Sequence, residues 1–133
     1  MSWLNAARKQ RLIVVFGIIG GVLLSVIGIR YLLTPESAAR TFGVPGRPAG
    51  YELHYIIGLR NLWLGLLAVA LAALREWRAL ALWFALGAIV CFADGSIAAS
   101  STGRLPQVAF HFGCGLACIG LAAGCWRLGR QAS

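Results

Sequence analysis

The most regular feature of this sequence is a series of four long stretches in which apolar side chains dominate and charged ones are rare. They cover roughly residues 12–33, 51–74, 79–99 and 106–126. Each is close to the ~20 apolar residues that an α-helix needs to cross the hydrocarbon core of a bilayer. The pattern predicts an all-α, polytopic membrane protein, with four transmembrane helices in an up-down bundle that form a single domain over residues 1–133.

A short additional helix is predicted in the connection between the first two stretches. Thr34, Pro35 and Glu36 have the order of an N-cap, an N1 proline and an early-turn acid. Residues 37–42 would continue this helix, and Gly43 would end it. Such a helix would lie in the membrane interface over the mouth of the bundle, either covering a site or simply connecting two spans.

The composition agrees with a membrane location. Of the 133 residues, 59% are hydrophobic, and the mean hydropathy is +0.78. A soluble domain of this size would need more polar side chains to cover its surface. The first stretch is too long for a cleaved signal peptide, and the segment after Ile29 offers no small-residue cleavage site.

The basic residues, which give the chain its net charge of +8, indicate by their distribution how the protein is oriented in the membrane. The more basic side of the four-helix topology carries Arg8, Lys9, Arg11, Arg75, Arg78, Arg127 and Arg130. The other side carries Arg40, Arg47 and Arg104, with Arg30 near its edge. The positive-inside rule therefore predicts that both termini are cytoplasmic, as in a protein of the bacterial inner membrane. No soluble basic domain is present, so we expect no nucleic-acid partner.

Five ionisable residues lie inside or at the edge of the apolar stretches, namely Glu52, His54, Arg60, Asp94 and His111. Such side chains are costly in a bilayer and usually face the bundle interior, a partner or a water-filled cavity. The predicted topology places all five in the outer half of the membrane. A shared depth is what a common site requires.

Small residues share helix faces with several of these polar residues. The faces are Gly17, Gly21, Leu24 and Gly28 on the first helix; His54, Gly58, Asn61, Gly65, Ala68 and Ala72 on the second; Gly87, Cys91, Asp94 and Ala98 on the third; and His111, Gly115, Cys118 and Ala122 on the fourth. Small residues mark the contact faces of membrane helices. A second small face on the last helix, which includes Gly113 and Gly120, suggests a homo-oligomer.

The clearest motif is Tyr55-x-x-Gly58-x-Arg60-Asn61-x-x-x-Gly65. Together with Pro35 and Gly43 before it, and Asp94 and His111-Phe112-Gly113 after it, this motif resembles a family of small four-helix membrane proteins from bacteria and fungi. That family is known mainly as a domain of unknown function and is broadly similar to the DoxX-like proteins. The resemblance implies the fold and a polar constellation of Gly58, Arg60, Asn61, Asp94 and His111. It implies no activity.

Each polar residue also has a purely structural interpretation. Arg60 and Asp94 could form an ion pair, and His111 could hydrogen-bond a carbonyl. Glu52 lies near enough to the interface to be solvated. The four cysteines lie within the predicted helices and are expected to be free packing residues, because no CxxC occurs. We expect no metal site, because four converging ligands cannot be assembled.

The favoured function is an outer-half polar pocket for a lipophilic small molecule, in a protein that also contacts membrane lipid. A carboxylate, an imidazole and a guanidinium are the groups needed for acid–base chemistry, such as isomerisation, cyclisation or epoxide opening. The candidate catalytic residues are Asp94, His111, Arg60, Glu52 and His54. The candidate substrate-binding residues are Asn61, Gly58 and Tyr55.

Three alternatives remain open at this point. The protein could bind a lipophile without catalysis or serve as a structural membrane subunit. It could hold a b-type haem between His54 and His111. The main expectation is nevertheless that the protein has no cofactor. It could also be a small transporter, but the first helix lacks the acidic residue found in the small multidrug type.

Overall fold

A computed structural model describes residues 2–44 and 50–131, with side chains from residue 7 onward. These residues contain no strand and form α1 (Ser2–Leu33), α2 (Pro35–Phe42), α3 (Glu52–Leu74), α4 (Trp77–Ser101) and α5 (Leu105–Gln131). All except α2 are long and apolar enough to cross a membrane. The predicted all-α membrane fold is therefore confirmed.

Two of the membrane helices extend well beyond their apolar stretches. α1 begins at Ser2 rather than at residue 12, and α5 continues past residue 126 to Gln131. The added turns carry Arg8, Arg11 and Arg130, which are good helix formers. These turns carry charged residues, so the apolar stretches in the sequence are shorter than the helices to which they belong.

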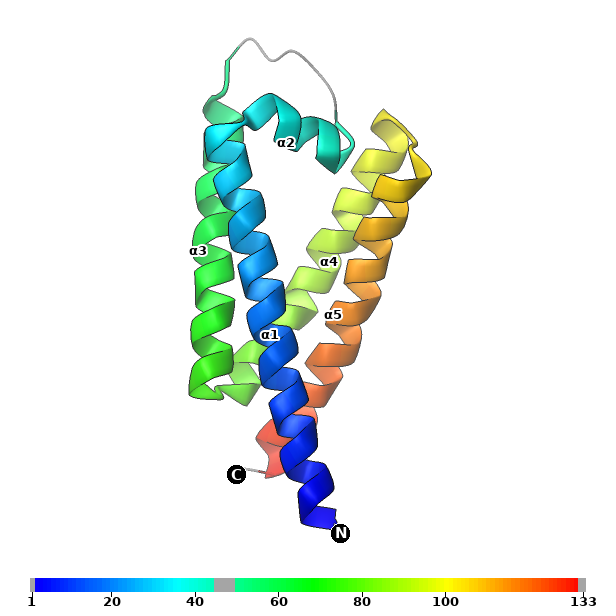
Figure 1. Ribbon diagram of the computed structural model, residues 1–133. Helices are drawn as coiled ribbons and strands as arrows, with labels where there is room; N and C mark the ends of the chain where they lie inside the picture. The colour runs from blue at the N-terminus through cyan, green and yellow to red at the C-terminus, as the bar shows by residue number, and fades with distance from the viewer. Residues whose placement is uncertain (1, 45–49, 132–133) are drawn as a thin grey trace.

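The four long helices pack as two pairs. α1 packs along α3, and α4 packs along α5, whereas contacts between the pairs are far fewer. Figure 1 shows that the pairs meet near the ends of the chain and diverge toward the opposite end, where α2 lies between them. We call this opposite end the α2 end. The up-down order of the helices agrees with the prediction, but their splayed arrangement was not anticipated.

The α1–α3 pair is held together by glycine contacts. A Cβ atom added at Gly21 would lie 2.6 Å from the carbonyl oxygen of Gly65, and one added at Gly28 would lie 2.6 Å from that of Gly58. The two backbones therefore touch without side chains between them, as is typical of small-residue faces in membrane helices. The predicted contact faces of these two helices are confirmed.

The larger cluster of buried core residues lies where the two pairs meet, and a smaller one joins Tyr31 of α1 to Ala38 and Ala39 of α2. The fully enclosed members of the larger cluster include Leu80, Phe84 and Cys125, and Ile13 and Ile18 of α1 pack against them. Large apolar side chains elsewhere, such as Leu86 and Leu116, lie on the outside. An exposed apolar surface on every long helix is what a lipid-facing bundle requires.

α2 has the predicted bounds, with Pro35 in its first turn and Gly43 as its C-cap. Gly43 has a φ of 105°, a left-handed conformation that glycine adopts without the strain of a side chain. Thr34 occupies the N-cap position, but its hydroxyl donates to the carbonyl oxygen of Arg30, at 3.2 Å, and does not cap the helix. The side-chain cap expected from the sequence is therefore absent.

Candidate functional site

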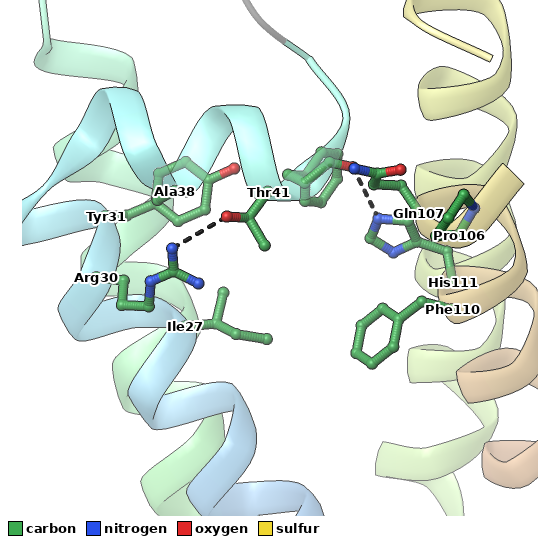
Figure 2. Close-up of a pocket in the computed structure, with 10 residues that line it drawn as sticks. Ile27, Arg30, Tyr31, Ala38, Thr41, Pro106, Gln107, Phe110 and His111 are labelled. Atoms are coloured by element: carbon green, nitrogen blue, oxygen red, sulfur yellow. Dashed lines mark hydrogen bonds between the residues drawn. The ribbon is translucent and has the colours of Figure 1, made fainter. Parts of the chain in front are cut away.

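A cleft opens between the two helix pairs beneath α2. Its volume is about 300 Å³. α1, α2 and α5 supply the lining residues, which are Ile27, Arg30, Tyr31, Ala38, Thr41, Phe42, Pro106, Gln107, Phe110 and His111. Figure 2 shows the α1 and α5 side chains on opposite sides of the cleft, with α2 crossing above them. The cleft follows from the fold, because two pairs that meet at one end leave space at the other.

Arg30 supplies the positive charge in this lining. It lies in the last turn of α1, and its Nη2 donates to the hydroxyls of Thr41, at 3.0 Å, and Ser37, at 3.4 Å. Both hydroxyls belong to α2. No carboxylate forms a salt bridge with Arg30 within residues 2–44 and 50–131. The guanidinium thus points toward α2 and the cleft, where neutral groups hold it (Figure 2).

His111 is the buried polar residue on the α5 side and is only 8% exposed. Its Nε2 lies 3.2 Å from the carbonyl oxygen of Phe42. A carbonyl can only accept, so Nε2 carries a proton and donates it to this bond. The ring also packs on Phe42, with 4.5 Å between ring centroids. His111 is therefore held in place by Phe42, through both its Nε2 and its ring.

Two further polar groups belong to this end of the α4–α5 pair. The side-chain oxygen of Gln107 is buried and has no hydrogen-bond partner in the part of the chain that the structure describes. Thr102 donates its hydroxyl to the carbonyl oxygen of Gly43, at 3.0 Å. The C-terminal end of α2 is thus attached to the α4–α5 pair through both Gly43 and Phe42.

Asp94, the predicted catalytic acid, lies half-buried on α4 and does not line the cleft. Its carboxyl is nevertheless within electrostatic range of both His111 and Arg60. Arg60 is exposed on α3, and no salt bridge joins it to Asp94, although the structure describes both residues. The structural ion pair considered from the sequence is therefore not formed as a direct contact.

The remaining predicted site residues lie on the first half of α3. Glu52 and Tyr55 are exposed, and Asn61 is half-buried. Gly58 is buried against the backbone of Gly28, which explains its small size by helix packing. None of these four residues lines the cleft. Their assignment to substrate binding or catalysis stays a prediction.

His54 lies between two tyrosines and apart from the cleft lining. Its ring centroid is 6.0 Å from that of Tyr31 and 5.9 Å from that of Tyr51. Its Nδ1 is buried without a hydrogen-bond partner among the described residues. A haem held by His54 and His111 through Nε2 would require His111 to break its bond to Phe42. The haem alternative stays a prediction.

The structure adds Arg30, Tyr31, Thr41 and Gln107 to the residues that the sequence selected. Arg30 could have been found by the rule that selected Arg60, because both arginines lie inside apolar stretches. It was instead assigned to the membrane edge as part of the charge distribution. Thr41 and Gln107 carry no such signal, because polar residues near helix ends are common.

Comparison with known proteins identifies a family for this chain. Neither the curated proteins nor the solved structures contain a match to this chain. The model of one family, described as Domain of unknown function (DUF4267), matches residues 21–127. The resemblance to an uncharacterised domain family is thereby confirmed, whereas the broader likeness to DoxX-like proteins stays a prediction. Since the match extends from the middle of α1 into the last turns of α5, the chain belongs to the family of this domain of unknown function.

Proposed function

We propose that this membrane protein binds a lipophilic small molecule in the cleft beneath α2. The observation that carries the proposal is the lining of the cleft, which combines apolar side chains such as Ile27 and Phe110 with Arg30, Gln107 and His111. Ligand sites are typically concave and mostly apolar, with a few polar groups that fix orientation. The cleft volume of about 300 Å³ is at the lower end of the range for such sites.

The buried oxygen of Gln107 supports a ligand rather than lipid tails alone. An unsatisfied buried acceptor costs about 1–3 kcal/mol, and hydrocarbon cannot supply a hydrogen bond. A ligand with a hydroxyl or another donor near this oxygen would recover that energy. The proposed ligand therefore has an apolar body and at least one polar group.

Photolabelling tests this proposal. The full chain in detergent is irradiated with a neutral long-chain alcohol that carries a diazirine, and the labelled peptides are mapped by mass spectrometry. We expect labelling to concentrate on residues 27–31 and 106–111. Ile27→Trp, which fills the cleft, should lower this labelling by about tenfold, equivalent to ~1.4 kcal/mol of binding.

Ile29→Trp is the matched control, because Ile29 is exposed on the same helix and does not line the cleft. It should leave the labelling unchanged. Labelling spread evenly over all lipid-facing helices, and insensitive to Ile27→Trp, would show that the cleft holds no preferred ligand.

Acid–base catalysis on the bound molecule is the second candidate function. The specific observation that favours it is His111 at the cleft, whose Nε2 donates to Phe42. In the neutral ring, Nδ1 would then serve as the base. Asp94, within electrostatic range, would stabilise the protonated ring. A half-buried carboxyl with no direct salt bridge to Arg60 would be free to act in this way.

Deuterium exchange tests the catalytic candidate without knowledge of the natural substrate. In D₂O, a base that removes a proton beside a ketone carbonyl returns a deuteron to the same carbon. We expect the chain to accelerate this exchange in a long-chain ketone by about a hundredfold over detergent alone. His111→Gln should abolish the acceleration and keep the photolabelling. Equal exchange rates in the variant and the native chain would remove His111 as the base.

A further inference from the structure

We propose that the ligand of the cleft carries an acidic head group, a carboxylate or a phosphate, and that Arg30 binds it. This inference rests on the proposed lipophile binding and adds the charge of the ligand. It follows from how Arg30 is partnered and from where it lies in the cleft.

The hydrogen-bond partners of Arg30 are neutral. An arginine side chain stays protonated in proteins and has five N–H donors. The observed bonds both use Nη2 and both lead to neutral hydroxyls, those of Thr41 and Ser37. Within the described residues no carboxylate forms a salt bridge with it. The guanidinium therefore has both charge and donors to offer a ligand.

The surroundings of Arg30 make an anion favourable. Ile27, Ala38 and Phe42 line the same cleft, and a charge beside apolar groups costs free energy unless it is paired. An acidic head group would supply the missing negative charge. Carboxylates and phosphates accept from guanidinium N–H groups, and a hydrogen bond between charged groups is about twice as strong as a neutral one.

The shape of the cleft gives the ligand a direction. Arg30 lies close to Thr41 of α2, whereas Ile27 and Phe110 lie farther from α2, on opposite sides of the cleft (Figure 2). A head group bound by Arg30 would therefore lie at the α2 end, with its hydrocarbon tail between Ile27 and Phe110. The polar end of such a molecule would contact polar side chains, and its apolar end would contact apolar side chains.

Competition with the neutral photoprobe measures this preference. The competitors are oleate, oleyl phosphate and oleyl alcohol, which share a chain and differ in the head group. For the native chain we expect the better of the two acids to displace the probe at a concentration about tenfold lower than the alcohol does. The acid that competes better identifies the head group as carboxylate or phosphate.

Arg30→Gln should abolish the preference for acids while labelling of the cleft by the neutral probe continues. Arg104→Gln removes an exposed arginine from the turn before α5 and should keep the preference. Should Arg30→Gln not fold, Arg30→Lys keeps the charge but loses the fixed N–H donors of the guanidinium, and it should retain only part of the preference.

Equal competition by oleyl alcohol and both acids in the native chain would overturn the inference, whatever the variants do. So would an acid preference that survives in folded Arg30→Gln. Either result would leave the proposed lipophile binding intact, because that proposal depends on where the neutral probe labels the chain. Failure of the labelling itself would overturn both.

Discussion

At the scale of single residues, Gly28 is one of the positions where the fold leaves no room for a side chain. A Cβ added there would lie 2.6 Å from both the Gly58 oxygen and the Leu62 nitrogen, and both are backbone atoms that cannot move aside. We expect Gly28→Ala to destabilise the protein by about 1–3 kcal/mol, as overpacking does. The measurement is the thermal unfolding of the chain in detergent.

Gly20→Ala is the matched control on the same helix. A Cβ there would meet only the Phe84 ring, at 4.0 Å. Alanine is a better helix former than glycine by about 1 kcal/mol, so this variant should be as stable as the native chain or more so. Equal destabilisation by the two substitutions would show that the α1–α3 contact does not depend on the close approach at Gly28.

The same scale shows how far sequence reasoning could identify the site. His111 was selected because an imidazole inside an apolar stretch is costly, and the structure buries it at the cleft. Gly58 was selected as part of the motif from Tyr55 to Gly65, but it serves α1–α3 packing. Arg30 was not selected as a site residue, because its position predicts an interfacial anchor equally well. Only the position of α2 shows that the guanidinium of Arg30 points into the protein.

At the scale of elements, the bounds of α2 were the most predictable feature, and its contacts with the α4–α5 pair were the least predictable. Pro35 and Gly43 give its bounds from local rules alone. Its attachments to the α4–α5 pair are Thr102 to Gly43, 59 residues apart, and His111 to Phe42, 69 residues apart. No local pattern encodes contacts at such separations. The sequence alone therefore does not decide whether α2 only connects two spans. In the tertiary structure, α2 forms one wall of the cleft.

Helix faces show the same limit. The small faces of α1 and α3 were predicted correctly because two glycine-bearing helices have few other ways to pack closely. The face predicted for α4 was only partly correct. Ala98 is buried as expected, but Gly87, Cys91 and Asp94 are half-buried, whereas Ala88 and Gly95 are enclosed. α4 packs through Phe84 and Leu80 as well, and a stripe defined by small residues alone omits these large ones.

At the scale of the whole molecule, the spans and their order were predictable from hydropathy, and the splay between the pairs was not. Hydropathy indicates that a helix contacts lipid. It does not indicate which of the other helices that helix packs against. The pairing of α1 with α3 and of α4 with α5 depends on side-chain fit at each contact. The cleft exists only because these pairs separate toward the α2 end (Figure 1).

The orientation of the bundle in the membrane is the remaining prediction at this scale. The beginning of α1, the end of α5 and the turn between α3 and α4 share one end of the molecule (Figure 1). That end carries the larger group of arginines and should therefore be cytoplasmic. We expect Val44→Cys, exposed at the α2 end, to react with a membrane-impermeant maleimide in intact cells.

Ser2→Cys should react only after the cells are permeabilised, because it would lie on the cytoplasmic side. The native chain is the control, since its cysteines are half-buried or buried within the long helices. The orientation also decides the access of ligands, because an acidic amphiphile would reach Arg30 from the outer leaflet. Labelling of Ser2→Cys but not Val44→Cys in intact cells would reverse the topology and place the cleft at the inner leaflet.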